Sequence, residues 1–176
     1  DRLFAWVTSG ALTDEAKADQ ALRLLTAADE LKRVDEVARA AALVREHRIP
    51  REAIPTTWLT FAEIWDALLA DMPMTAMIRN LATMTRVGLL TAGSDAAKTV
   101  VARLGDEARL QKARVHPIAL LAALTTYKSG HGARGSGTWA PVAAVVDALD
   151  GAFYHAFKAV EPSGKRTLLA LDVSGS

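Results

Sequence analysis

The stretch that decides the fold is residues 72–88, MPMTAMIRNLATMTRVG. Pro73 separates this stretch from the residues before it, and Gly88 closes it. The apolar residues between them recur at helical spacing, at Met74, Met77, Ile78, Leu81 and Met84. The stretch therefore predicts an amphipathic helix. Its methionines are expected to pack in a core, which is a more common role for them than forming a binding groove.

Helices of the same kind are expected along most of the chain. Each is marked by a capping residue or a proline near its start and by apolar residues at helical spacing behind it. The expected starts are Thr13, Thr60 (in a capping box with Glu63), Ser94, Pro117 and Pro141, and a further helix carries an apolar stripe from Val34 to Val44. Paired helices with short turns predict an all-α fold of HEAT-like helical repeats, an α-solenoid. A compact helical bundle would show the same periodicity.

The end of the chain carries a different pattern. A turn at residues 162–164 precedes the apolar run 167–171, which predicts one β-strand. Asp172, Ser174 and Ser176 follow directly, and their oxygen atoms are ligands of the kind that Mg²⁺ prefers. Taken alone, such a motif is more often an ordinary capped turn.

Two regions follow from these patterns. Residues 1–162 are expected to form part of a helical-repeat region, and residues 163–176 the truncated start of an α/β domain. The chain begins at Asp1 without an initiator methionine, so we interpret it as a fragment. The remaining ligands of a complete Mg²⁺ site would come from later loops, so we expect the site to be incomplete and unoccupied here.

The composition excludes several classes of protein. Of the 176 residues, 51% are hydrophobic, 23% are charged and none is cysteine. These values exclude a disordered chain, a disulfide scaffold, a thiolate zinc site and a cysteine nucleophile. The chain also lacks the H-E-x-x-H, G-x-S-x-G and G-x-x-x-x-G-K-[ST] motifs, so we predict that it is not an enzyme. No run of 18 apolar residues occurs, and we expect a cytoplasmic protein without a membrane partner.

Charge is distributed unevenly. Residues 1–71 hold 13 acids and 9 Lys or Arg, a net charge of −4, whereas residues 72–176 hold 7 acids and 12 Lys or Arg, a net charge of +5. From Arg109 to Val146 there is no Asp or Glu at all. A basic surface without local counter-charge attracts polyanions and releases their counterions on binding. A solvated basic face without a ligand is about equally consistent with charge alone.

The candidate RNA-binding residues lie in this basic half. We expect phosphate contacts from the cations and base stacking from Tyr127. The set is Arg79, Lys112, Arg114, His116, Tyr127, Lys128, His131 and Arg134. Arg79 could equally form an intramolecular salt bridge, and His116 could serve as a loop or capping residue. The glycine-rich segment 130–137 is either a flexible connector or a basic loop that lies along a nucleic-acid backbone.

Several segments, taken in order, resemble the TROVE module of the Ro autoantigen family. They are IPTTWLT (54–60), MPMTAMIRNL (72–81), KARVHP (112–117), TYKSGHG (126–132), AFY (152–154), VEPSGKR (160–166) and DVSGS (172–176). The resemblance extends over roughly residues 20 to 176 and implies the C-terminal part of a ring of HEAT-like repeats. The last segment is similar to the opening of the metal site in von Willebrand A domains, which implies Mg²⁺ as the cofactor.

The resemblance also implies a function. Members of this family bind small non-coding Y RNAs and the single-stranded 3′ ends of misfolded RNAs, act in RNA quality control, and in bacteria associate with an exoribonuclease. We therefore expect a non-enzymatic RNA-binding protein. The alternative is a protein-interaction scaffold that recruits a nuclease or another partner through the repeat surface and the A domain. Ring closure and a complete metal site are not expected from this fragment.

Overall fold

The computed structural model describes residues 8–9, 22–132, 136–166, 168 and 170. Regular structure within these residues is helical, apart from one isolated bridge between His131 and Thr138, so the all-α prediction is confirmed for this part of the chain. The helices are α3 (Arg23–Leu31), α4 (Val37–His47), α5 (Ala62–Asp71), α6 (Met74–Arg86), α7 (Asp95–Leu104), α8 (Glu107–Lys112), α9 (Pro117–Ser129) and α10 (Ala143–Ala156), with the 3₁₀ turns η2 (Arg51–Ala53), η3 (Trp58–Thr60) and η4 (Phe157–Ala159).

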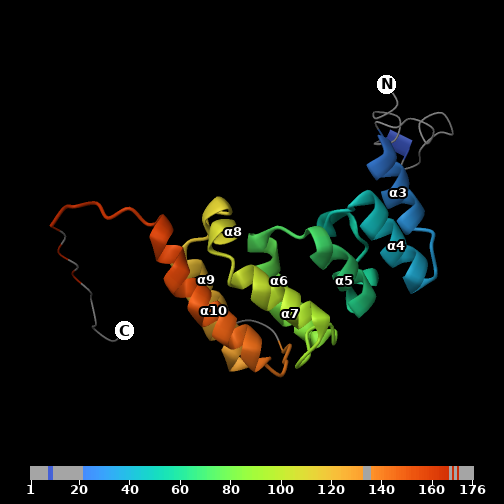
Figure 1. The fold of residues 1–176 in the computed structure, drawn as a ribbon. Coiled ribbons are helices and arrows are strands. Elements are labelled where there is room, and N and C mark those ends of the chain that lie inside the picture. The colour runs from blue at the N-terminus through green and yellow to red at the C-terminus, as the bar shows by residue number, and fades with distance from the viewer. Residues whose placement is uncertain (1–7, 10–21, 133–135, 167, 169, 171–176) are drawn as a thin grey trace.

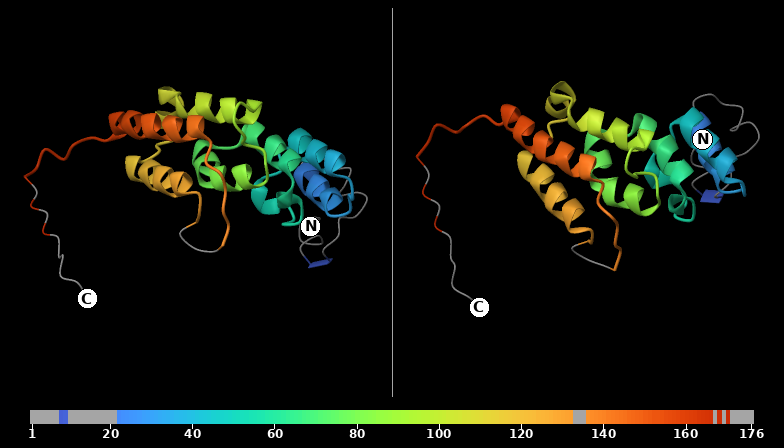
Figure 2. Two further views of the ribbon diagram at one scale, coloured as in Figure 1. Left: turned by 90° about the horizontal axis from the view of Figure 1, so that it is seen from below. Right: turned by 60° about the horizontal axis from the view of Figure 1, so that its bottom comes forward.

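The helices form an extended array in which neighbours pack against one another (Figure 1). Helix α3 packs on α4, α4 on α5, and α6 on both α5 and α9. Helix α10 lies against α7, α8 and α9 and closes the other end of the array (Figures 1 and 2). The chain after α10 leads away from the helices. This arrangement is the one expected of a solenoid, and the assignment as HEAT-like repeats stays a prediction.

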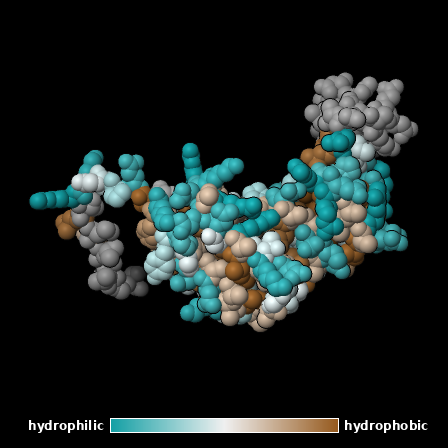
Figure 3. Space-filling model, viewed as in Figure 1, coloured by the Kyte–Doolittle hydropathy of each residue, from teal (hydrophilic) through white to brown (hydrophobic). Residues whose placement is uncertain are grey.

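One continuous apolar core runs through the array. Met77 and Met84 of α6 are fully buried in it, as is Trp65 of α5 at 1% exposure. The prediction that the methionine stripe packs in the core is therefore confirmed. Some large apolar side chains stay outside this core, and hydrophobic patches show among hydrophilic ones in Figure 3.

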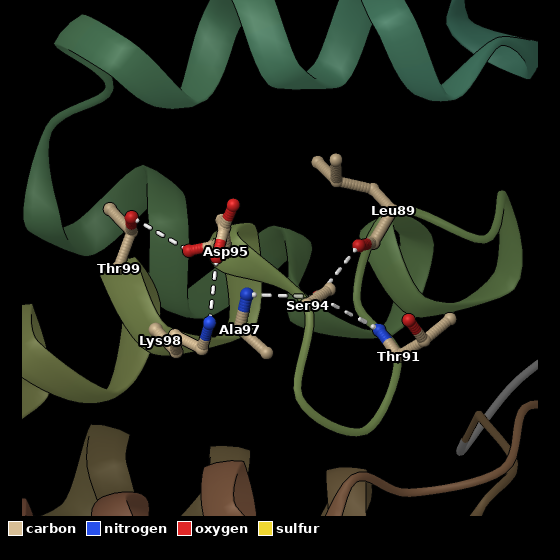
Figure 4. Close-up of polar contacts among 7 residues, drawn as sticks. All are labelled: Leu89, Thr91, Ser94, Asp95, Ala97, Lys98 and Thr99. Atoms are coloured by element: carbon tan, nitrogen blue, oxygen red, sulfur yellow. Dashed lines mark hydrogen bonds and ion pairs between the residues drawn. The ribbon is translucent and has the colours of Figure 1, made fainter.

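Helix starts follow the sequence signals at two sites and depart from them at Thr60 and at Pro141, since α10 begins at Ala143. The expected start at Thr13 lies outside the described residues. Ser94 caps α7: its Oγ accepts from the N–H of Ala97 at 3.2 Å and donates to the carbonyl of Leu89 at 3.2 Å (Figure 4). Pro117 is the first residue of α9, as predicted. The capping box at Thr60 is wrong, because Thr60 lies in η3 and its hydroxyl donates to the carbonyl of Thr57.

Two helix ends place an arginine where glycine is usual. Arg48 after α4 and Arg114 after α8 both have φ of 50°, in the left-handed region. In each case the next N–H reaches back five residues, from Ile49 to Val44 at 3.1 Å and from Val115 to Leu110 at 3.2 Å. This left-handed conformation costs a residue with a Cβ more than it costs glycine, so both corners hold a small local strain.

The predicted strand is not found at the residues that can be described. Leu168 and Ala170 lie outside any strand, and the Leu168 side chain is 94% exposed. A single strand without a neighbour leaves its backbone groups unpaired and has nothing to bury its side chains against. Asp172, Ser174 and Ser176 lie outside the described residues, so the Mg²⁺ motif, the A domain and the domain boundary remain predictions. No described helix is long and apolar enough to cross a membrane.

Candidate nucleic-acid interface

A groove of about 340 Å³ lies between α6 and α9. Helix α6 contributes Arg79 to it, between the smaller residues Thr75 and Ala82. The opposite wall consists of Val115, at the corner before α9, and small residues of α9 such as Ala119. Small side chains on both walls leave space between the two helices. Arg79 is the charged residue of the groove's lining.

Two more candidates lie at the corner between α8 and α9, next to a residue that lines this groove. Arg114 and His116 flank Val115 in the chain, and Val115 itself lines the groove. His116 is the N-cap of α9, where its Nδ1 accepts from the N–H of Ile118 at 3.2 Å. The capping interpretation of His116 is therefore confirmed. The hydrogen bond from Ile118 orients the His116 ring, and Nε2 is left for another partner.

The basic candidates are not neutralised by acids. Their side chains are exposed, and none makes an ion pair with a described residue; they are Arg79, Lys112, Arg114 and Lys128. The salt-bridge interpretation of Arg79 is therefore wrong within the described part of the chain. Four arginines of the acidic half do pair with carboxylates; they are Arg33, Arg39, Arg45 and Arg48.

One cation of the segment without acids, residues 109–146, is neutralised by a neighbouring carboxylate. Arg109 pairs with Asp106, the N-cap of α8, at 3.0 Å. Lys128 lies at the other end of α9 from His116, about 18 Å away along the helix axis. His131 is exposed and forms the bridge with Thr138, whereas Arg134 lies outside the described residues. Arg79 thus lines the groove itself, whereas Arg114 and Lys128 are exposed at the two ends of α9.

Tyr127 does not fit the stacking role predicted for it. Its side chain is 2% exposed, and its ring stacks on Trp139 with centroids 6.4 Å apart. Its hydroxyl hydrogen-bonds Thr85 at 2.8 Å and accepts from the N–H of Val142 at 3.3 Å. Tyr127 thus ties α9 to α6 and to the start of α10. It lies at the base of the groove as a structural residue, because every polar and aromatic surface it has is already used.

The comparisons with known proteins identify the family. Residues 46–126 match the TROVE domain. This segment is a TROVE domain sequence. The chain is similar to "RNA-binding protein RO60" of Caenorhabditis elegans, with 45% identity over 158 residues, 89% of this chain and 24% of the relative. It is similar to the protein of the same name from Deinococcus radiodurans, with 48% identity over 140 residues, 79% of this chain and 26% of the relative.

A solved structure agrees with the sequence comparison. The crystal structure of the Deinococcus radiodurans RO (RSR) protein superposes with a TM-score of 0.83 at 39% identity, covering 94% of this chain and 33% of that one. The chain thus spans about a quarter of the length of the curated relatives. The predicted resemblance to the TROVE module is confirmed. Arg79, Lys112, Arg114 and His116 lie within the matched TROVE segment, and Tyr127 directly follows it.

Sequence reasoning missed two exposed aromatic side chains on the last helix and its 3₁₀ extension. Tyr154 is 65% exposed and Phe157 is 50% exposed, and both rings contact Phe153 with centroids 5.2 Å apart. Among the described residues there is no group of three His, Cys, Asp or Glu side chains arranged to hold a metal ion.

Proposed function

We propose that this chain binds single-stranded RNA along the α6–α9 groove. The observation that carries the proposal is that Arg79, Lys112, Arg114 and Lys128 are exposed and without an acidic partner among the described residues. Unneutralised cations are the groups that displace counterions from a phosphate backbone. The name of the Caenorhabditis and Deinococcus relatives, "RNA-binding protein RO60", supports the same function.

The geometry favours one strand over a duplex. A groove of about 340 Å³, lined by Arg79 and by alanine and threonine side chains, would admit a flexible strand whose phosphates contact Arg79 and reach the exposed cations at the two ends of α9, Arg114 and Lys128. A-form duplex RNA is stiff and presents phosphates on two strands, and it would meet this groove only at its rim. We further propose that the bound RNAs are Y RNAs and the single-stranded ends of misfolded RNAs. The chain would bind them without catalysing a reaction, as part of RNA quality control in the cytoplasm. An exoribonuclease is the proposed partner, and Mg²⁺ at Asp172, Ser174 and Ser176 the proposed cofactor.

The test is a salt titration of RNA binding with matched variants. Fluorescence anisotropy of a labelled single-stranded RNA is measured for the wild type and for Lys112→Ala with Arg114→Ala. Loss of two phosphate contacts reduces the slope of log K against log salt by about 1.4, because each contact to a single strand contributes about 0.7. The control variant is Arg45→Ala with Lys98→Ala, which removes the same charge from exposed side chains that already have acidic partners.

The proposal fails if affinity is independent of salt. It also fails if the control double variant loses as much affinity as the Lys112 and Arg114 double variant, because binding would then follow net charge alone.

A second function, a protein-interaction scaffold, is favoured by the apolar side chains on the outer surface of α9 and α10. Ile118 is 68% exposed and Leu121 is 44% exposed on α9, in addition to Tyr154 and Phe157. Clusters of exposed apolar residues mark protein contacts. Capture of a nuclease that persists after RNA is digested, and that is lost with Ile118→Ser and Leu121→Ser, would establish this function. Capture that ends with digestion would assign the contact to RNA.

A further inference from the structure

A second and larger pocket of about 700 Å³ opens on the other side of Arg79. Its floor is apolar and comes from three elements: Ile49 after α4, Leu68 of α5 and Met72 before α6. Its rim carries the guanidinium groups of Arg48, Arg51 and Arg79. This volume lies within the range typical of small-molecule sites, about 300–1,000 Å³.

We propose that this pocket binds one nucleotide unit, with the base on the apolar floor and the phosphate between Arg51 and Arg79. The ligand chemistry is that of a nucleoside 5′-monophosphate, either free or as one unit of an RNA strand. The proposal extends the RNA-binding function, since Arg79 also lines the α6–α9 groove. It does not depend on that function, because a free nucleotide can fill the pocket alone.

The charges at the rim leave two guanidinium groups available for an anion. Arg48 is paired with Asp71 at 3.2 Å, so that carboxylate is already neutralised. Arg51 and Arg79 have no ion pair with a described residue, and Glu52 is the other carboxylate of the lining. The Arg51 guanidinium lies 5.9 Å from the centre of the Trp65 ring, which holds it in place through a cation–π contact.

The pocket wall is held rigid from the outside. Arg103 of α7 donates hydrogen bonds to the carbonyls of Ala70 at 2.7 Å and Met72 at 3.4 Å. These bonds fix the turn between α5 and α6, and with it the floor at Met72. A preformed floor reduces the entropy cost of binding, which is the condition under which a small ligand gains measurable affinity.

Nucleotide chemistry suits this lining better than that of a simple anion. Guanidinium groups bind phosphate through two parallel hydrogen bonds and also stack on planar rings. The amide nitrogen of Asn80 donates to the Ala76 carbonyl at 2.8 Å, and its oxygen is left to accept from a base amino group. A bare phosphate would use the rim and leave the floor of Leu68 and Met72 exposed to water.

The two cavities share a local feature of the backbone. Each takes a lining residue from the position after a left-handed arginine, Ile49 after Arg48 and Val115 after Arg114. Arg79 lies between the two cavities and lines both. A strand in the α6–α9 groove can therefore place its next nucleotide in this pocket with Arg79 on the shared phosphate.

The experiment uses the methionine methyl groups as reporters in NMR spectra of the full chain labelled with ¹³C at the methionine methyl carbons. Adenosine 5′-monophosphate is titrated, and we expect the Met72 signal to shift because Met72 lines the pocket. Met77 and Met84, which are fully buried away from it, serve as internal references that stay in place. Parallel titrations with adenosine and with inorganic phosphate should each require higher concentrations than the nucleotide.

Matched variants test the rim. Arg51→Ala is expected to weaken nucleotide binding about tenfold, the loss of one charge-assisted hydrogen-bonding group. Arg45→Ala, also an exposed arginine but outside the lining, should bind as the wild type does. An unlabelled RNA oligomer that displaces the nucleotide from Met72 assigns the pocket to the RNA path, whereas RNA bound without displacement assigns it to free nucleotide.

The inference is overturned if the Met72 signal is unmoved by millimolar nucleotide. It is also overturned if inorganic phosphate binds as tightly as the nucleotide, or if Arg51→Ala binds it as the wild type does. Failure of the RNA-binding proposal is seen separately, as salt-independent anisotropy in a protein whose Met72 signal still responds to nucleotide.

Discussion

Arg114 combines a backbone position suited to glycine with a charge on the edge of the candidate groove. Its φ of 50° lies in the left-handed region, and its neighbour Val115 completes the helix end through the bond to Leu110. A residue with a Cβ is retained at such a position only when the surrounding structure holds it there, and residues of this kind concentrate at functional sites. Glycine would therefore suit the backbone at this position, whereas RNA binding would require the arginine side chain.

Replacing Arg114 with glycine separates these two demands. Arg114→Gly is expected to leave the free energy of unfolding unchanged within about 1 kcal/mol, because glycine adopts this φ freely but gains entropy in the unfolded chain. RNA affinity should fall and depend less on salt, since one phosphate contact is gone. Urea unfolding and anisotropy on the same preparation check both. Undiminished affinity, with the fold intact, would remove Arg114 from the interface.

Tyr127 offers the complementary case, a residue required for structure alone. Tyr127→Phe removes the hydroxyl that bonds Thr85 and the N–H of Val142, and it leaves the ring stacked on Trp139. We expect a loss of about 1–3 kcal/mol in the free energy of unfolding, since the buried N–H of Val142 loses its partner. RNA affinity per folded molecule should not change. Tyr154→Phe, at an exposed position, is the control and should leave stability unaltered.

At the scale of the elements, the sequence predicts helices well because local chemistry determines them. Ser94 and Pro117 start helices as predicted, since a hydroxyl that accepts from the helix N–H groups and a fixed φ act within four residues. Thr60 has the same local signal and does not start one. Trp58, two residues earlier, is buried with its indole N–H bonded to the Leu31 carbonyl, and this distant contact favours the 3₁₀ turn that includes Thr60.

One carboxylate of α8 makes polar contacts with the end of α10 and with η4. Glu107 accepts from Nζ of Lys158 at 2.5 Å, and Nδ1 of His155 lies 2.7 Å away. The hydrogen bond from Lys158 is the largest cause that lowers the pKa of Glu107, with the charges of Lys158 and His155 acting in the same direction and desolvation opposing them. A lowered pKa means that the folded state favours the ionised carboxylate.

The pH dependence of stability follows from this direction. The stabilisation by Glu107 is fully present above the pKa of an unfolded glutamate, about 4.3, and is lost as the pH falls below it toward the lower folded value. Melting temperatures of the wild type should therefore fall between about pH 5 and pH 3 more steeply than those of Glu107→Gln. Parallel curves for the two proteins would show that the contact contributes nothing in solution.

At the scale of the whole molecule, the position of the unpaired cations relative to the two cavities could be predicted only in part. The sequence shows no acid from Arg109 to Val146, which predicts unpaired cations there. Lys112, Arg114 and Lys128 indeed have no ion pair with a described residue. Sequence spacing does not show that α6 packs against α9, and so the meeting of Arg79 with Val115 in one groove, and with Ile49 in the other pocket, comes from tertiary packing alone.

The overall architecture also has a measurable consequence. Among the described residues, the main contacts of α3 are with α4, whereas α10 packs against α7, α8 and α9. In an array of this kind each element is stabilised mainly by its neighbours, so the end with one neighbour opens first. Hydrogen exchange read by mass spectrometry should therefore show faster exchange in residues 23–31 than in residues 143–156, with α4 to α6 intermediate. A compact bundle opens as one unit, and equal exchange at both ends under mild denaturant would contradict the solenoid assignment.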